Sequence, residues 1–483
     1  MNLCGIFGVA GSKEASSEIY LGLMHLQHRG QDATGITTCN VESGEVYRVK
    51  DVGLVSEVFN EENINSLKGT IGIGHTRYPT VGVGDRGEVQ PFFVKKPDGL
   101  GLAFNGNIVN YPLLKKKMKE EGRVYLTSNS DAEVMLQIFA DEYEKSTGMD
   151  SVFNAVKKVH DEVIGGYAVI MIIAEKGILA FKDQNGIRPL VMGEKDVNGK
   201  KSYAFASESI ALTIQGYNNI TDLKPGEAVF AGNNGDIQRR IIDADKAASC
   251  VFEWVYFSTV ESTIDGKPVY EIRKKLGQVL AEKITRKWPD LEIDAVMPVP
   301  DTSRSAANSL AKVLGVPYEE GLIKNRYVGR TFIMPAQKMR DNAVKLKLKP
   351  VESVIKGKNV MIVDDSIVRG TTSKRIVKLA HDSGAKKVYF VSTFPPITSP
   401  CFYGIDFQRS EELIASNKTI DEVEKELGAD KLIYMDVGGL ENALGTKELC
   451  TGCLTEKYPT STKHVKELAE LRREHQAKIS EGC

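Results

Sequence analysis

The sequence Val360-Met361-Ile362-Val363-Asp364-Asp365-Ser366-Ile367-Val368-Arg369-Gly370-Thr371-Thr372 decides the fold of the carboxyl-terminal half of this chain. Its four apolar residues, 360–363, predict a buried parallel strand. Asp364 and Asp365 follow at the carboxyl end of that strand, where open α/β sheets place their ligands. The turn 369–372 leads into a predicted helix over 373–380, so backbone N–H groups and hydroxyls of the turn can bind a phosphate. Because two adjacent acids exceed what a helix cap requires, we favour a ligand site over a capped strand.

This stretch resembles the PRPP-binding signature of the type I phosphoribosyltransferases, which displace pyrophosphate from 5-phosphoribosyl-1-pyrophosphate (PRPP) with a nitrogen nucleophile. The resemblance implies that the two aspartates face the ribose hydroxyls or a hydrated Mg²⁺ ion. It also implies one Mg²⁺ per subunit, held by Asp364, Asp365 and the hydroxyl of Thr302, with Ser303 as the alternative. The residues of the turn that would contact PRPP are Arg369, Gly370, Thr371 and Thr372.

A basic run lies between Asn325 and Pro350. It carries seven basic residues, Arg326, Arg330, Lys338, Arg340, Lys345, Lys347 and Lys349, against the single acid Asp341. The composition of this run by itself fits a solvated loop as well as it fits a functional one. Beside a PRPP signature we interpret the run as a mobile lid that closes on pyrophosphate and excludes water, with Arg330 and Lys347 contacting PRPP.

The amino terminus offers a candidate nucleophile, Cys4, at the start of the short β-like run 4–9. A cysteine at a mature amino terminus has its own α-amine as a base, with an unperturbed pKa of about 7.7–8.0. A lone cysteine is more often a small buried hydrophobe. Here Cys4 becomes the terminus only if residues 1–3 are removed as a propeptide, since loss of the initiator methionine would expose Asn2. With residues 1–3 retained, we expect very low glutaminase activity.

Three further segments carry groups that glutamine hydrolysis needs. Arg77 offers a guanidinium for an α-carboxylate, Asn105 and Gly106 offer an amide and a backbone N–H for an oxyanion hole, and Asp131 offers a carboxylate for an ammonium. Each has a plainer alternative: a surface arginine, an Asn-Gly turn, and a helix cap at Ser130. Together with Cys4 and in this order, with residues 28–32 between Cys4 and Arg77, these segments resemble the class II glutamine amidotransferase domain of the N-terminal-nucleophile fold. That resemblance implies the roles named here.

Composition predicts a large cytoplasmic protein with two domains. The chain has 483 residues, 42% hydrophobic and 26% charged, and a net charge of −1. A length of this kind exceeds one hydrophobic core. The near-neutral charge favours neither nucleic acid nor an anionic membrane. We find no run of 18 apolar residues and no signal peptide pattern, so we expect no membrane span and no export.

The pattern of predicted elements changes near residues 235–255. Before it, short strands such as 167–173, 177–181 and 227–230 predict antiparallel sheets, with helices over 132–143 and 152–163. After it, strands 293–298, 359–363 and 387–392 alternate with helices, which predicts a parallel sheet. The predicted domains are a propeptide over 1–3, a glutaminase α/β/β/α sandwich over 4–240, a phosphoribosyltransferase α/β domain over 255–460 and a helical tail over 461–483. We interpret the tail as a solvated face.

Four of the seven cysteines form a separate signal, and they are Cys250, Cys401, Cys450 and Cys453. Cys450 and Cys453 have a CxxC spacing that can chelate one metal centre. The same spacing suits a redox pair or a zinc site, and spacing does not choose between them. Cys39 and Cys483 are interpreted as incidental.

From Cys4 to about Thr460 the chain resembles the amidophosphoribosyltransferase family. The resemblance implies synthesis of 5-phosphoribosylamine, glutamate and pyrophosphate from PRPP, glutamine and water, the first step of purine synthesis, with ammonia passed internally. One branch of the family holds a 4Fe-4S cluster through four cysteines in similar contexts, which implies one cluster per subunit here. The family also implies inhibition by purine nucleotides and a homo-oligomer, a dimer or a tetramer.

Two other functions are compatible with parts of the sequence. An amidotransferase that aminates a sugar phosphate would share the amino-terminal half, but the strand ending in Asp364 and Asp365 argues against it. A non-enzymatic iron-sulfur sensor would bind PRPP or nucleotides while its glutaminase stays silent behind an uncleaved Met1-Asn2-Leu3.

Overall fold

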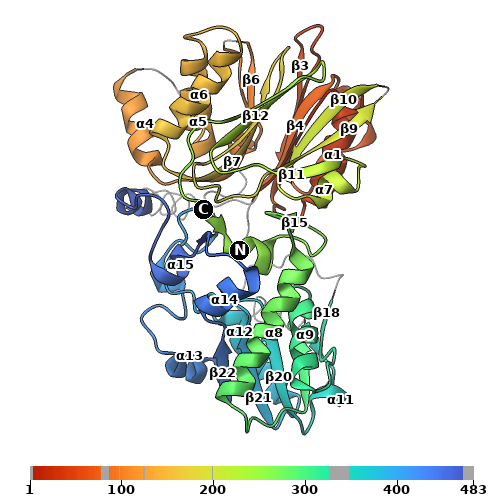
Figure 1. The fold of residues 1–483 in the computed structure, drawn as a ribbon, viewed down its shortest axis with the longest axis vertical. Coiled ribbons are helices and arrows are strands. Elements are labelled where there is room, and N and C mark those ends of the chain that lie inside the picture. The colour runs from red at the N-terminus through yellow and green to blue at the C-terminus, as the bar shows by residue number, and fades with distance from the viewer. Residues whose placement is uncertain are drawn as a thin grey trace.

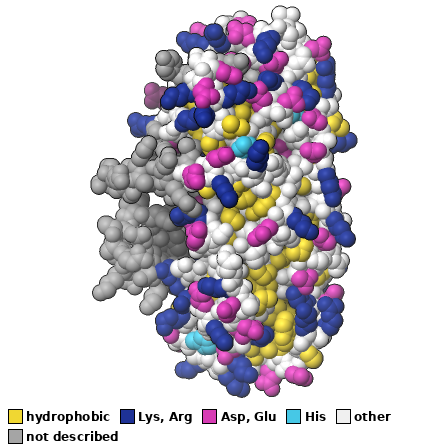
Figure 2. All heavy atoms as spheres, turned by 90° about the vertical axis from the view of Figure 1, so that its left-hand side faces the viewer, with side chains coloured by type: hydrophobic (Ala, Val, Ile, Leu, Met, Phe, Trp, Pro, Cys, Tyr) yellow, Lys and Arg dark blue, Asp and Glu magenta, His cyan; other side chains and the backbone are white. Residues whose placement is uncertain are grey.

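The computed structural model describes residues 4–77, 86–96, 98–122, 126–197, 199–325 and 348–470. The chain folds into two units stacked along the longest axis of the molecule (Figure 1). The amino-terminal unit carries two stacked sheets, and the carboxyl-terminal unit is built on one parallel sheet. Charged side chains of both signs are interspersed over the face of the molecule that Figure 2 shows.

The first sheet of the amino-terminal unit has seven strands in the order β11-β9-β10-β1-β4-β2-β3, all antiparallel to their neighbours. Its strands are β1 (Gly5–Ala10), β2 (Ala33–Cys39), β3 (Val46–Val52), β4 (Ile71–Arg77), β9 (Val191–Val197), β10 (Lys200–Ala206) and β11 (Asn218–Asp222). Helix α1 (Ala15–His25) covers its outer face, where Ile19 and Leu23 pack against Phe7 and Val9 of β1. The shorter helices beside it are α2 (Val55–Val58), α3 (Glu61–Ser66) and α7 (Ile210–Thr213).

The second sheet has six antiparallel strands in the order β13-β12-β8-β7-β6-β5. They are β5 (Phe92–Val94), β6 (Leu100–Ile108), β7 (Gly165–Ile173), β8 (Gly177–Lys182), β12 (Glu227–Gly232) and β13 (Ile237–Ile241). Helices α5 (Asp131–Tyr143) and α6 (Met149–Glu162), with α4 (Tyr111–Glu120) beside them, share the core on its outer face. Ile6 and Ile73 of the first sheet pack against Ile170 and Ile172 of the second. The predicted α/β/β/α sandwich is therefore confirmed.

The carboxyl-terminal unit has a parallel sheet in the order β17-β20-β21-β22. These strands are β17 (Ala295–Pro298), β20 (Asn359–Asp364), β21 (Lys387–Ser392) and β22 (Lys431–Tyr434). Met361 and Val363 of β20 face the core shared with α8 (Val269–Lys287) and α9 (Arg304–Leu314). Val360 and Ile362 face the core shared with α12 (Thr371–Asp382) and α13 (Ile420–Leu427). Helices on both faces explain why residues 360–363 of this strand are all apolar, as predicted.

Smaller elements complete the carboxyl-terminal unit. The paired strands are β14 (Ser249–Cys250) with β23 (Leu449–Cys450), β15 (Thr263–Ile264) with β16 (Lys267–Pro268), and β18 (Leu322–Lys324) with β19 (Leu348–Pro350). The remaining helices are α11 (Glu352–Ile355), α14 (Val437–Leu444) and α15 (Gly452–Thr455), and a π-helical turn spans Glu253–Phe257.

Two expectations need comment. The helix predicted over 373–380 begins at Thr371, because Gly370 adopts a left-handed conformation and starts the helix two residues earlier. In the tail, residues 465–470 are helical, but Leu468 is only 3% exposed and belongs to the core of the amino-terminal unit. The interpretation of this stretch as a purely solvated face was wrong, because one apolar side chain packs into that core.

Within the described ranges, no helix combines the length and the apolar composition that crossing a membrane requires.

Candidate active sites

Cys4 lies immediately before β1, in the middle of the first sheet, and is half-buried. Strands β1 and β4 are antiparallel, with Gly5 opposite Thr76. Continuing this register by one residue places Cys4 beside Arg77, the last residue of β4. The guanidinium of Arg77 forms an ion pair with Glu88. The candidate nucleophile and the candidate carboxylate-binding arginine therefore end neighbouring strands.

Asn105 and Gly106 lie inside strand β6, so the alternative of an Asn-Gly turn was wrong. The Asn105 side chain is completely buried, and neither its Nδ2 nor its Oδ1 has a hydrogen-bond partner among the described residues. A buried amide is normally paired, so this one is available for a ligand. At Gly106 a Cβ would lie 2.2 Å from the backbone oxygen of Gly166, so a side chain does not fit there.

Two hydrogen bonds bring β4 and α5 to the same end of β6. Nε2 of His75, on β4, lies 3.2 Å from the backbone oxygen of Phe104, the neighbour of Asn105. The Asp131 carboxylate, at the first residue of α5, accepts from the backbone N–H of Ile108 at 3.0 Å. Ser130 occupies the cap position of α5 but makes no capping bond through its side chain. The four segments predicted to bind and hydrolyse glutamine thus converge on one end of the sandwich.

His75 does not serve this site as a base. Burial lowers the pKa of His75 to about 3, and the charge of Arg77 contributes to the shift. The ring is therefore neutral at physiological pH. Its position fixes β4 against β6 and leaves the α-amine of a processed Cys4 as the base that the sequence suggested.

The second candidate site is formed by Asp364 and Asp365, at the carboxyl end of β20. Both are buried, with 7% and 9% of their surfaces exposed. Burial raises the pKa of both carboxyls, and Asp365 raises that of Asp364 further. A hydrogen bond from Ser366 Oγ, 2.8 Å from Asp365 Oδ1, and the charge of Arg273 oppose the rise at Asp365. A pair of buried carboxyls at such a position favours a nearby positive charge.

The candidate hydroxyl ligands lie on the loop next to this pair. Val299, which follows β17, donates its backbone N–H to the oxygen of Val363 at 2.8 Å, so this loop continues beside the end of β20. Thr302 is half-buried in the turn before α9. The Ser303 hydroxyl is buried and has no hydrogen-bond partner among the described residues. Thr302 and Ser303, which the sequence analysis gave as alternative Mg²⁺ ligands, therefore both lie on the loop beside the carboxyl end of β20.

The turn after the aspartates has the geometry of an anion site. Gly370 has φ +70°, and a Cβ there would lie 2.1 Å from Cδ1 of Ile414. Thr371 and Thr372 are exposed in the first turn of α12, where backbone N–H groups are free to bind an anion. Arg369 is also exposed, and its guanidinium pairs with Glu412.

Arg330 and Lys347, the other predicted PRPP contacts, lie outside the described residues. The described ends of that stretch are joined, because β18 and β19 pair antiparallel with Leu322 opposite Pro350.

The four candidate iron ligands lie in one buried neighbourhood. Cys250 and Cys450 are opposite each other in the parallel pair of β14 and β23. The backbone oxygen of Cys453 accepts hydrogen bonds from Thr398 and Ser399, both at 3.1 Å, which connects α15 to the segment that carries Cys401. All four cysteines are between 6% and 8% exposed. Burial raises the pKa of the Cys250 thiol to about 11, with a contribution from Cys401, and raises the pKa of Cys450 and Cys453 well above the usual value.

Arg188 is a completely buried arginine beside these thiols that the sequence analysis did not single out. Its Nε donates to the backbone oxygen of Tyr403 at 2.8 Å, and its Nη1 has no hydrogen-bond partner among the described residues. The cysteines Cys250, Cys401 and Cys450 all act electrostatically on its guanidinium. Nothing local in the sequence separates Arg188 from other arginines, because the groups around it come from distant segments.

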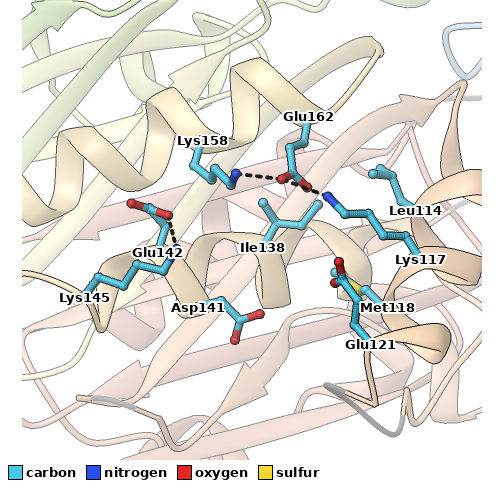
Figure 3. A pocket seen from close by; sticks show the side chains of 10 residues that line it. All are labelled: Leu114, Lys117, Met118, Glu121, Ile138, Asp141, Glu142, Lys145, Lys158 and Glu162. Atoms are coloured by element: carbon cyan, nitrogen blue, oxygen red, sulfur yellow. Dashed lines mark hydrogen bonds and ion pairs between the residues drawn. The ribbon is translucent and has the colours of Figure 1, made fainter.

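Among the described side chains, no group of three or more His, Cys, Asp or Glu is arranged so that it could hold a metal ion. The structure also contains a shallow pocket between α4, α5 and α6 (Figure 3). Five of its charged side chains pair with one another: Lys158 and Lys117 with Glu162, at 2.7 and 3.2 Å, and Lys145 with Glu142 at 2.7 Å. It contains none of the predicted site residues.

Comparison with known families divides the chain in the same way. Residues 75–214 match the glutamine amidotransferase domain, and residues 269–401 match the phosphoribosyl transferase domain. Among solved structures, glutamine PRPP amidotransferase from B. subtilis, in complex with ADP and GMP, is 38% identical, with a TM-score of 0.84 and coverage of 95% of this chain and 98% of that chain.

Curated relatives agree over most of the chain. Amidophosphoribosyltransferase from Pseudomonas aeruginosa is 46% identical, covering 92% of this chain and 89% of the relative. The Saccharomyces cerevisiae enzyme of the same name is 42% identical, covering 97% and 95%. With these identities over nearly the whole length, the chain belongs to the amidophosphoribosyltransferase family.

Proposed function

We propose that this protein converts PRPP, glutamine and water into 5-phosphoribosylamine, glutamate and pyrophosphate, the first step of purine nucleotide synthesis. The observation that carries the proposal is the convergence of Cys4, Arg77, Asn105 and Asp131 on one end of the sandwich. A phosphate-binding turn follows two buried carboxylates in the other unit of the same chain.

In the first half-reaction, Cys4 Sγ attacks the carboxamide carbon of glutamine while the α-amine of Cys4 takes the thiol proton. This step requires the loss of residues 1–3. The negative oxygen of the tetrahedral intermediate is stabilised by Asn105 Nδ2 and by the backbone N–H of Gly106. The α-ammonium of Cys4 returns that proton to the amide nitrogen, which leaves as ammonia, and water then hydrolyses the thioester to release glutamate and the free thiol. Arg77 and Asp131 hold the α-carboxylate and the α-ammonium, which keeps the amide in line with Sγ.

In the second half-reaction, ammonia attacks C1 of PRPP and pyrophosphate leaves. The N–H groups and hydroxyls of the turn 369–372 bind the 5-phosphate, and the carboxylates of Asp364 and Asp365 bind the ribose hydroxyls. Mg²⁺, with carboxylate and hydroxyl oxygens as its preferred ligands, would neutralise the charge of the leaving pyrophosphate when bound to Asp364, Asp365 and Thr302. The burial of both aspartyl groups side by side at the carboxyl end of β20 supports this fit, since a bound cation would favour their ionised forms. Arg330 and Lys347, which lie outside the described residues, stay predicted contacts of PRPP.

The buried cysteines support a 4Fe-4S cluster bound by Cys250, Cys401, Cys450 and Cys453. The CxxC spacing of Cys450 and Cys453 would equally suit a zinc site, and the resemblance of all four cysteines to the iron-sulfur branch of the family favours the cluster. The buried guanidinium of Arg188, whose Nη1 makes no hydrogen bond with the described residues but lies 3.6 Å from Glu253 Oε1, adds positive charge beside these cysteines and suits a negatively charged cluster. When bound, the cluster would join β14, next to the amino-terminal unit, to α15.

We further propose cytoplasmic localisation, a homo-oligomer of two or four subunits, an internal route for ammonia and inhibition by purine nucleotides. The complex of the B. subtilis relative with ADP and GMP supports the last of these.

The decisive experiment measures pyrophosphate release from PRPP and Mg²⁺ with glutamine or with ammonium as nitrogen donor, on protein purified without oxygen. We expect turnover with both donors, loss of only the glutamine reaction in Cys4→Ser, and an amino-terminal mass that begins at Cys4. No turnover with either donor would reject the enzyme and favour the iron-sulfur sensor. Turnover with ammonium but not with glutamine, together with a retained Met1-Asn2-Leu3, would show a blocked glutaminase.

A further inference from the structure

Arg29 is the residue that fixes the backbone of the candidate nucleophile. It follows α1, is completely buried, and donates from Nε to the backbone oxygen of Cys4 at 3.2 Å. Its Nη1 donates to Glu208 Oε1 at 2.6 Å. Its Nη2 donates to both carboxylate oxygens of Glu253, at 2.8 and 3.0 Å. One guanidinium therefore binds Cys4 and two carboxylates from segments 179 and 224 residues away in the sequence.

The two carboxylates belong to different parts of the molecule. Glu208 follows β10 of the amino-terminal sheet. Glu253 begins the π-helical turn after the sandwich, and its neighbours Phe252 and Trp254 pack in the core of the carboxyl-terminal unit. The Phe252 ring lies 4.5 Å from that of Phe394, which follows β21. The contact from Arg29 to Glu253 thus connects Cys4 to the unit that carries Asp364 and Asp365.

The turn that carries Glu253 is held rigidly. Arg273 of α8 donates to the backbone oxygens of Trp254 at 2.9 Å and Ser258 at 2.7 Å. Glu208 in turn accepts from the Ser262 hydroxyl at 2.8 Å and from the Thr259 N–H at 3.0 Å. A displacement of this segment is therefore transmitted to both carboxylates that bind Arg29.

We propose that Arg29 and Glu253 are positioning residues for glutamine hydrolysis, which hold the carbonyl of Cys4 against the carboxyl-terminal unit. The proposal rests on the proposed function of Cys4. A chain terminus is poorly ordered unless it is held in place, and a nucleophile at a terminus has only one neighbouring residue to hold it. The fixed fork of a guanidinium meets three acceptors at once, which a lysine ammonium on a flexible stem does not reproduce.

The test compares Glu253→Gln and Arg29→Lys with the wild-type protein. In Glu253→Gln one acceptor becomes an N–H₂ group that faces the N–H groups of Arg29. The matched control is Glu18→Gln, because Glu18 is a largely buried acid of the same unit that pairs with Lys195 at 2.7 Å and has no place in either site. Glutamate release and ammonium-dependent pyrophosphate release are measured on each protein, with the unfolding temperature.

We expect kcat for glutamate release to fall about 10–100-fold in both variants, as for a displaced reacting group. KM for glutamine stays unchanged because Arg77 and Asp131 are intact, and ammonium-dependent turnover stays at the wild-type level. Glu18→Gln leaves kcat unchanged both for glutamate release and for ammonium-dependent pyrophosphate release. The proposal is overturned if Glu253→Gln and Arg29→Lys keep wild-type kcat, or if all three variants lose both activities in proportion to their loss of stability.

The Cys4→Ser variant separates this proposal from the proposed function. If Cys4→Ser keeps glutamine-dependent turnover, Cys4 is not the nucleophile and both proposals are wrong. If Cys4→Ser is inactive with glutamine while Arg29→Lys and Glu253→Gln behave as wild type, only the positioning role fails.

Discussion

The two candidate sites of this molecule are assembled in opposite ways. The aspartate pair and the phosphate turn come from thirteen consecutive residues at the end of one strand, 360–372. The glutaminase site draws on β1, β4, β6 and α5, and a guanidinium bound to Glu208 and Glu253 holds its nucleophile. A contiguous site is shaped by local backbone geometry, whereas a dispersed site depends on the packing of the whole unit. We therefore expect point substitutions to remove binding or reacting groups from the first site and to displace the reacting groups of the second.

The largest effect is expected for Asp364→Asn. Loss of one carboxylate should lower turnover with both nitrogen donors by about 10³-fold, because several kcal/mol of charge stabilisation are removed. Burial and Asp365 disfavour the charge of Asp364, so the variant should also unfold about 2–4 °C higher in metal-free buffer. Pyrophosphate release measures the change in turnover, and calorimetry measures the change in unfolding temperature. An inactive variant with a lower unfolding temperature would mean that the pair stabilises the fold.

Asn105→Ala probes the dispersed site. The buried amide has no partner in the described structure, so its loss should cost little stability. Removal of one oxyanion donor should lower kcat for glutamate release by about 10²-fold and leave ammonium-dependent turnover intact. Steady-state kinetics with both donors measures this. Equal losses with the two donors would indicate that Asn105 has a structural role shared by both sites.

Gly370→Ala tests how strictly local geometry shapes the phosphate turn. A left-handed alanine costs roughly 1–2 kcal/mol, and its Cβ would also overlap Ile414 Cδ1 at 2.1 Å. We expect lower stability and a higher KM for PRPP with either donor. Gly428→Ala is the matched control, since Gly428 has φ +74° and nothing within 4 Å of the added Cβ. If both variants behave alike, the close contact with Ile414 has no effect on the site.

The smallest effect concerns pH. Burial lowers the pKa of His75 to about 3, whereas an unfolded histidine titrates near about 6.5. Between these values the unfolded chain binds a proton that the native chain does not, so stability falls as pH falls, by about 1.4 kcal/mol per pH unit. His75→Gln should reduce this slope relative to the wild-type protein. Urea unfolding at pH 7 and pH 5 measures the difference, and equal slopes would show that His75 is protonated in the native state.

Much of the fold and of the contiguous site was predictable because the signals are local. Strand β21 has the predicted bounds, β20 extends the predicted strand 359–363 by one residue at its carboxyl end, and the aspartate pair lies where a parallel strand must present it. The candidate residues of the site around Cys4 could be recognised from their order along the chain. That they lie close together in the fold could not be derived from that order, because their proximity depends on the register of β1 against β4 and on the contact of β4 with β6.

The sequence by itself determined two α/β units, a strand that ends in two acids and a turn able to bind an anion. These features depend on hydrophobic periodicity, side-chain charge and the backbone freedom of glycine, which all act over a few neighbouring residues. Only the tertiary structure decided that Asn105 would be buried without a partner in a strand, and that Leu468 would return to the first core. It also decided that Arg29 would meet Glu253 across 224 residues and that Arg188 would lie beside the cysteines. Such contacts between buried charges arise from the packing of distant segments, and no local pattern of residues encodes them.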